Sequence, residues 1–214
     1  MGQTIAFCGL PSENLSRVLD YRRRLPHWIP DHSILFVTWR LAGSLPVPQA
    51  ELLTSGKAGR VPFAQQDERL ARSSSGPFWL RDPQVASMVE QALLYGETAR
   101  RLYVLHAWVI MPNHVHVVLE PHFELPQIMR WLKGRTSRKA NQMLGRKGLP
   151  FWQDESYDHW IRSAEELNEL ISYVERNPVQ AGLVGSDEQW PWSSASRKAD
   201  DTRRSSAPRE LVQT

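Results

Sequence analysis

Apolar and polar positions alternate in a way that predicts three strands in the first two thirds of the chain. The run "SILFVTWRL" over residues 33–41 is rich in β-branched and aromatic residues, which is typical of a strand. The stretches 101–110 and 114–120 have the same character and are separated only by "MPN". So short a connection predicts that these two strands pair as an antiparallel hairpin.

A helix is predicted in "DPQVASMVEQALLYG", where apolar residues recur at helical spacing. Asp82 can cap its first turn, Pro83 suits the first helical position, and Gly96 can end it. A short helix is also expected within 47–57. The segment 58–77 contains Gly, Pro and a run of Ser, so it is expected to be a connection.

Two more helices are expected in the second half of the chain. A basic helix over 126–143 carries an apolar side formed by Ile, Trp and Leu residues. The last helix begins at Ser163, where "SAEE" has the pattern of a capping box. It is expected to end at Asn177, because Pro178 restricts the residue before it.

The predicted order is strand, helix, strand, strand, helix, helix, with one further edge strand near 182–195. This order favours an α+β fold, in which an antiparallel sheet carries helices packed mainly on one face. We expect one domain over 27–195. A flexible basic segment at 1–26 precedes it, and a polar, disordered tail at 196–214 follows it.

Composition favours a cytoplasmic protein with no membrane partner. The single cysteine, Cys8, excludes a disulfide within the chain. No apolar run approaches the roughly 20 residues that span a bilayer, and the N-terminus lacks the pattern of a signal peptide.

The distribution of charge adds a candidate partner, because seven basic residues and no acidic residue lie from Arg130 to Lys147. Such a stripe attracts phosphate backbones, although a patch that serves only solubility would look the same.

Two histidines stand one residue apart in "VIMPNHVHVVLEP". In a strand, His114 and His116 share one face, while Val115 and Val117 point the other way. Two imidazoles placed in this way can bind one metal ion. They can also be two polar residues on the exposed face of a half-buried strand, and the spacing leaves both interpretations open.

Tyr173 and Asn177 lie one turn apart on the last predicted helix, at the shoulder of its apolar stripe. The amide oxygen could complete a three-ligand metal site with the two histidines, and a phenol beside such an ion could act as a nucleophile. Tyr157, in "ESYDHW", is the rival nucleophile. It lies outside the regular helix and lacks an amide one turn away, so Tyr173 is preferred.

These motifs resemble those of the REP-associated tyrosine transposases, a bacterial branch of the single-tyrosine HUH transposases. The resemblance runs from residue 22 to residue 195 and includes "RRRLPHW", "FVTWRLAGSLP", "AWVIMPNHVHVVLEP" and "YVERNPVQAGLV". The most specific part is "MPN" before the pattern His-hydrophobic-His. The tyrosine and asparagine in "YVERN" follow at the expected distance.

The resemblance implies an HUH-endonuclease-like fold, related to the ferredoxin-like and RRM-like folds. It implies that His114, His116 and Asn177 bind Mg²⁺ or Mn²⁺ and that Tyr173 is the nucleophile. Enzymes of this family cut single-stranded DNA, often beside a hairpin, by joining the tyrosine to the 5′-phosphate and releasing a 3′-hydroxyl. The implied protein is bacterial and nucleoid-associated, acts on single-stranded or hairpin DNA, and is a monomer or a homodimer.

A protein that binds single strands combines a cationic track with aromatic side chains that stack on bases. The residues predicted to bind DNA are therefore Arg130, Lys133, Arg135, Arg138, Lys139 and Trp152. Two other functions stay open at this point. One is a DNA-binding protein that no longer cleaves, and the other is a hydrolase in which the two histidines hold zinc.

Overall fold

The computed structural model describes residues 33–44 and 76–206 of the chain. The predicted basic segment at 1–26, the short helix predicted within 47–57 and most of the connection predicted at 58–77 lie outside the described residues. In the part that is described, no helix is both long and apolar enough to cross a membrane.

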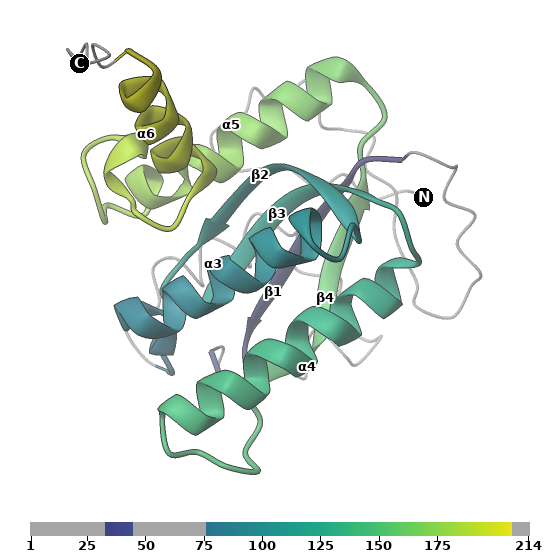
Figure 1. Ribbon diagram of the computed structural model, residues 1–214, viewed down its shortest axis with the longest axis vertical. Helices are drawn as coiled ribbons and strands as arrows, with labels where there is room; N and C mark the ends of the chain where they lie inside the picture. The colour runs from purple at the N-terminus through teal and green to yellow at the C-terminus, as the bar shows by residue number, and fades with distance from the viewer. Residues whose placement is uncertain (1–32, 45–75, 207–214) are drawn as a thin grey trace, which may run out of the picture.

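The described elements form a four-stranded sheet with helices packed against it (Figure 1). The strand order is β2-β3-β1-β4, and every neighbouring pair is antiparallel. The predicted hairpin is therefore confirmed as β2 and β3. In chain order the elements are β1 (Leu35–Leu41), η1 (Trp79–Arg81), α3 (Pro83–Thr98), β2 (Tyr103–Ile110), β3 (His114–Pro121), α4 (Leu125–Met143), β4 (Trp152–Trp160), α5 (Ala164–Gln180), η2 (Asp187–Gln189) and α6 (Ser194–Ser206).

Successive strand side chains point to opposite sides of the sheet, and each side has its own core. On one side, Leu35, Val37 and Trp39 of β1 pack with residues of α3 and α4 in the larger hydrophobic cluster. On the other side, Phe36 packs with Tyr173 and other residues of α5 in a smaller cluster. We call these sides the α3/α4 face and the α5 face. The predicted α+β class with an antiparallel sheet is confirmed, but the helices are divided between the two faces of the sheet and do not lie mainly on one.

The fourth strand is not the one predicted near 182–195. It is β4, which pairs with β1 along the edge of the sheet. Its sequence, "WQDESYDHW", lacks apolar alternation because an edge strand exposes much of its length. Residues 182–195 instead contain the short helix η2 and a single bridge between Ser193 and Val109.

The stretch around that bridge covers the outer edge of β2. The backbone N–H of Ile110 donates to the carbonyl of Trp192 at 2.9 Å, and the indole N–H of Trp190 donates to the carbonyl of Ile110 at 2.9 Å. One residue pair further along, the backbone N–H of Trp108 donates to the hydroxyl of Ser194 at 3.2 Å. The end of the β2 edge at Trp108 and Ile110 thus finds its hydrogen-bond partners within the same chain.

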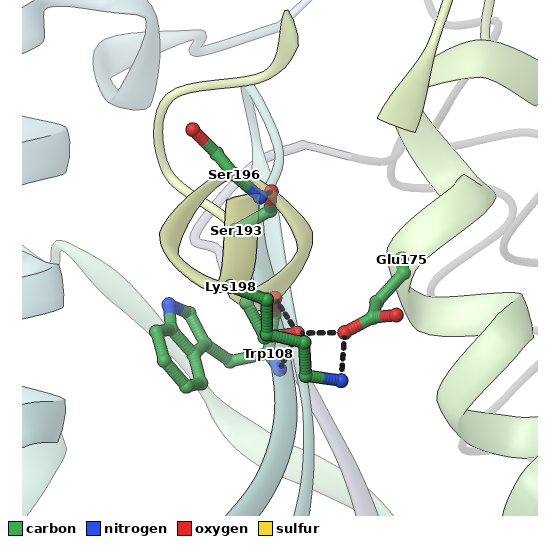
Figure 2. A network of polar contacts seen from close by, with 6 residues as sticks. Trp108, Glu175, Ser193, Ser196 and Lys198 are labelled. Atoms are coloured by element: carbon green, nitrogen blue, oxygen red, sulfur yellow. Dashed lines mark hydrogen bonds and ion pairs between the residues drawn. The ribbon is translucent and has the colours of Figure 1, made fainter. Parts of the chain in front are cut away.

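Residues 196–206, predicted as part of a disordered tail, belong to helix α6. Figure 2 shows why this polar helix has a fixed place: Glu175 of α5 points at Lys198 of α6, beside the backbone of Trp108. The Glu175 carboxylate accepts hydrogen bonds at 2.7 Å from both the Ser194 hydroxyl and the Lys198 ammonium. These contacts join α6 to α5 and to the sheet, which the sequence of α6 alone does not reveal.

Two helix ends also differ from prediction. Helix α3 is capped by Asp82 as expected, but it continues past Gly96 to Thr98. Gly96 is a packing position, because a Cβ atom there would collide with the Tyr103 hydroxyl. Helix α5 continues past Pro178 to Gln180, since a proline removes only one N–H and both Asn177 and Pro178 are buried against the rest of the fold.

Candidate active site

The two predicted histidines lie in the middle of the sheet, on the α5 face. Strand β3 runs between β2 and β1, where His116 pairs with Val109 on one side and with Thr38 on the other. His114 and His116 are both 0% exposed. Their ring centroids are 4.7 Å apart, so the two imidazoles lie side by side, as the strand periodicity predicts.

One ring nitrogen of each histidine is held by a neighbouring side chain. The Thr38 hydroxyl lies 2.7 Å from Nδ1 of His116, and Oδ1 of Asn113 lies 2.7 Å from Nδ1 of His114. An amide oxygen only accepts, so Nδ1 of His114 donates in that contact. With Nδ1 engaged, Nε2 is the nitrogen that each ring can present to a metal ion.

Sequence reasoning missed both of these supporting residues. Asn113 stood in the "MPN" motif, so its position was visible although its contact was not. Thr38 is 78 positions away from His116 in the chain. Only the pairing of β1 with β3 brings the two together, and no local pattern in the sequence reports that register.

Helix α5 brings the predicted tyrosine and asparagine to the same place. Tyr173 and Asn177 are each 4% exposed. The Tyr173 ring lies 5.9 Å from the His116 ring, centroid to centroid, and 6.2 Å from that of Phe36. Asn177 follows one turn later on the same helix and is buried like the tyrosine. The structure therefore gathers the phenol and the histidine pair on one face of the sheet.

The start of α5 is fixed by a hydrogen-bond network that also includes β4. Ser163 caps the helix as predicted, accepting from the backbone N–H of Glu166 at 3.1 Å. The Glu166 carboxylate accepts from the backbone N–H of Arg162 at 2.7 Å and lies 2.8 Å from Nε2 of His159. His159 thus ties β4 to the first turn of the tyrosine helix.

This network changes the ionisation of Glu166. Burial is the largest single influence and acts to raise the pKa of the carboxyl. The hydrogen bonds from His159 and from the Arg162 backbone, together with the charges of those two residues, outweigh it, so the pKa of Glu166 is lowered. The carboxylate form is therefore the one that the fold stabilises.

Tyr157, the rival nucleophile, also reaches the α5 face. It pairs with Thr38 from β4, and its ring meets that of Phe36 edge-on with centroids 6.3 Å apart. Burial raises the pKa of Tyr157, and the carboxylates of Asp158 and Glu166 raise it further. Those effects disfavour the phenolate of Tyr157.

The donor set suits a divalent cation. Nε2 of His114, Nε2 of His116 and Oδ1 of Asn177 are all buried. Two imidazole nitrogens with one neutral oxygen suit Mn²⁺ better than Mg²⁺, which prefers oxygen ligands. Among the described residues, no group of three or more His, Cys, Asp or Glu could hold a metal ion. An ion at the histidine pair would therefore take a ligand of another type, such as Asn177.

The residues predicted to bind DNA do not all have surfaces that a strand could reach. Arg130, Arg135, Arg138 and Lys139 are exposed on α4. Trp152 is only 5% exposed and donates from its indole N–H to Thr136 at 2.8 Å, so its ring offers little surface on which a base could stack.

Lys133 also has an internal role. Its ammonium donates to the backbone carbonyls of Gln153, Asp154 and Glu155 at 3.0 to 3.1 Å. An ammonium has three protons, and these three carbonyls can take them all. Lys133 therefore secures the start of β4 against α4, and its geometry does not favour the predicted contact with DNA.

Comparison with known proteins finds a transposase family and several relatives. Residues 83–177 match the family model described as "Transposase IS200 like". The matched segment contains both histidines of β3 as well as Tyr173 and Asn177 of α5. The REP-associated tyrosine transposase of Escherichia coli (strain K12) is 28% identical over 98 residues, which is 45% of this chain and 57% of that protein.

A relative of the same type from Haemophilus influenzae is 29% identical over 101 residues, covering 41% of this chain and 56% of its own length. The chain thus matches a little over half the length of these curated relatives. A solved structure described as a REP-associated tyrosine transposase bound to a REP hairpin has the same fold, with a TM-score of 0.56 and 20% identity. The match covers 91% of this chain and 92% of that one. The predicted resemblance to the REP-associated tyrosine transposases is confirmed.

Proposed function

We propose that this protein is a metal-dependent DNA transesterase, which cuts and rejoins single-stranded DNA beside a hairpin through a 5′-phosphotyrosine intermediate. The observation that carries the proposal is the packing of the Tyr173 ring against His116, in a pair of imidazoles whose Nδ1 atoms are both engaged. The transposase relatives, one of them bound to a REP hairpin, support the same substrate class.

The proposed reaction consists of two transesterifications. The phenolic oxygen of Tyr173 attacks the scissile phosphorus, a new bond joins the tyrosine to the 5′-phosphate, and the bond to the 3′-oxygen breaks. The phenol loses its proton to solvent, and the departing 3′-oxygen takes one up. In the second step a 3′-hydroxyl attacks the phosphotyrosine and restores the phenol. The number of phosphoester bonds is conserved, so no external source of energy is required.

His114, His116 and Asn177 are the residues that would hold the divalent cation. Such an ion would draw charge from the phosphate oxygens and so make the phosphorus easier to attack. The chain itself keeps the imidazoles in position through Thr38 and Asn113. It also keeps the phenol on a helix whose first turn is tied down by Glu166.

Because the candidate site is buried, DNA must gain access to it before the reaction can begin. His114 and His116 are fully buried and Tyr173 is 4% exposed. A phosphodiester therefore reaches the phenol only when neighbouring residues move aside. We expect this opening to precede chemistry, and we expect a closed site to protect the phosphotyrosine from water.

The experiment is an assay for a covalent adduct that survives denaturing electrophoresis. The substrate is a hairpin oligonucleotide with a single-stranded flank, taken from inverted repeats beside the gene, with Mn²⁺ or Mg²⁺ present. We expect the wild-type protein to form the adduct, and we expect Tyr173→Phe or removal of the metal to abolish it. Tyr157→Phe is the matched control and retains the adduct.

An adduct that survives Tyr173→Phe would overturn the assignment of the nucleophile. Hairpin binding without an adduct under either metal ion would instead support a DNA-binding protein that does not cleave. Peptide mapping of the adduct places the phosphate on a single tyrosine and so decides between residues 173 and 157.

A further inference from the structure

An aromatic stack stands on the outer surface where α3 meets α4. Tyr95 of α3 lies nearly parallel to Trp131 of α4, with ring centroids 6.3 Å apart and planes 17° apart. The guanidinium of Arg135, one turn along α4, lies 5.1 Å from the centroid of Tyr95 and 5.9 Å from that of Trp131. Two rings and a cation thus form one cluster on the surface.

The cluster keeps one ring accessible while fixing its orientation. Tyr95 is 45% exposed, although it is a large aromatic side chain. Trp131 supports it from beneath the surface, and the close approach of α4 depends on Gly96, since a Cβ there would lie 3.1 Å from the Trp131 ring. A tyrosine that served only to join the two helices would be buried between them.

The exposed charged residues of α4 beside the stack are cationic. Arg130, Arg138 and Lys139 are exposed on the same helix as Trp131, and the chain has no acidic residue from 130 to 147. Arg100 is exposed one turn beyond Tyr95, just after the end of α3. A flat aromatic face bordered by cations is complementary to a nucleobase attached to a phosphate backbone.

We propose that Tyr95, Trp131 and Arg135 form a stacking platform for an unpaired base of single-stranded DNA. The base lies on the exposed ring of Tyr95, Arg135 binds the adjacent phosphate, and Arg130 and Arg138 continue the contact along the backbone. This platform rests on the proposed function in that it supplies the DNA-binding surface of the same enzyme. It replaces the buried Trp152 as the aromatic component of the cationic track.

The platform and the histidine pair lie on opposite faces of the sheet. The stack lies where α3 meets α4, whereas Tyr173 of α5 packs against Phe36 on the other side of the sheet. A strand that reaches both must pass around the sheet. The platform therefore acts on binding and leaves the chemical step unchanged, so its loss raises KM for adduct formation without lowering kcat.

Binding of a fluorescent oligo(dT) measured by anisotropy in EDTA tests this directly, because cleavage is absent without metal. Tyr95→Ala is expected to weaken binding by about 5- to 150-fold, which corresponds to one stacked base. Tyr95→Phe keeps the ring and retains binding. The matched control is Phe123→Ala, since Phe123 is 52% exposed but precedes the basic run at 130–147.

Tyr95→Leu guards against a folding defect, because it keeps apolar contact with Trp131 and loses only the aromatic face. If both Tyr95→Ala and Tyr95→Leu unfold at the wild-type temperature and bind oligo(dT) as tightly as the wild type, the platform is refuted. Equal weakening by Phe123→Ala would refute it as well. Neither result depends on formation of the covalent adduct at Tyr173. The platform and the proposed function can therefore be refuted independently.

Three further substrates identify where the base comes from. They are a blunt hairpin, the same hairpin with a 5′ overhang, and the hairpin with a 3′ overhang. The platform predicts that Tyr95→Ala weakens binding only to substrates whose unpaired bases reach it, whether these lie in the loop or in one overhang. An equal loss on a fully paired duplex without a loop would show a site for double-stranded DNA and overturn the proposal.

Discussion

The two faces of one sheet differ in what they bury. The α3/α4 face is filled by apolar side chains such as Val37, Val117 and Leu119. The α5 face buries two imidazoles, a threonine and an amide beside a small apolar cluster. Strand β3 contributes to both faces, because His114 and His116 point one way and Val115 and Val117 the other.

The difference shows how a small domain can separate stability from reactivity. Buried polar groups are costly unless they have hydrogen-bond partners. On the α5 face those partners come from Thr38, Asn113 and the network around Glu166. The opposite face contains the larger apolar core, and burial of that core offsets the free-energy cost of the buried polar groups. The same side of the molecule carries the exposed stack of Tyr95 and Trp131.

Neighbouring substitutions in β3 give the sharpest contrast. His116→Ala is expected to slow adduct formation by about 10³-fold, since it removes a metal ligand and several kcal/mol of transition-state stabilisation. Val117→Ala is expected to lower the free energy of unfolding by about 2 kcal/mol while the folded protein keeps its rate. Rate assays and urea unfolding on both variants measure this. If Val117→Ala slowed the reaction as much as His116→Ala, the separation of the two faces would be wrong.

Thr38 tests whether the α5 face positions its ligands. Thr38→Val removes the hydroxyl that holds Nδ1 of His116 but preserves the shape of the side chain. We expect Mn²⁺ affinity, measured by calorimetry, to fall by about 10- to 100-fold. Thr38→Ser keeps the hydroxyl and restores the affinity. Equal losses in Thr38→Val and Thr38→Ser would point to packing and count against a hydrogen-bonding role.

Substitution of Glu166 is expected to change the free energy of unfolding least, and the change depends on pH. Because the pKa of Glu166 is lowered from 4.5 in the folded protein, the carboxylate stabilises the fold above that value, and this contribution is lost as the pH falls through the folded pKa. Glu166→Gln is expected to cost about 1 kcal/mol at neutral pH. Unfolding curves of variant and wild type should converge in acid. Glu124→Gln, at an exposed carboxylate outside this network, serves as the control, and a constant difference at every pH would contradict the assignment.

Local sequence patterns were sufficient to predict the elements whose defining residues lie close together in the chain. The hairpin, the Asp82 cap, the Ser163 cap and the shared face of the two histidines all follow from residues close together in the chain. Strand β4 and helix α6 carry no such signal. Both are polar, and both are held by contacts with distant residues: β4 by Lys133, and α6 by Glu175.

In the candidate site, too, some residues could be predicted from the sequence and others could not. Resemblance to a family supplied His114, His116, Tyr173 and Asn177, and the structure gathers the histidines and the tyrosine. It could not supply Thr38, whose role depends on the register between β1 and β3. Composition could not show that Trp152 is buried, because an aromatic residue beside a basic helix is as suited to a core as to a surface.

The segment from Trp190 to Ser194 has a bearing on self-association. By occupying the backbone groups of Trp108 and Ile110, it closes this end of the β2 edge to strands from any other molecule. A chain cut short before this segment would expose an open row of amides and carbonyls of the kind that leads to aggregation.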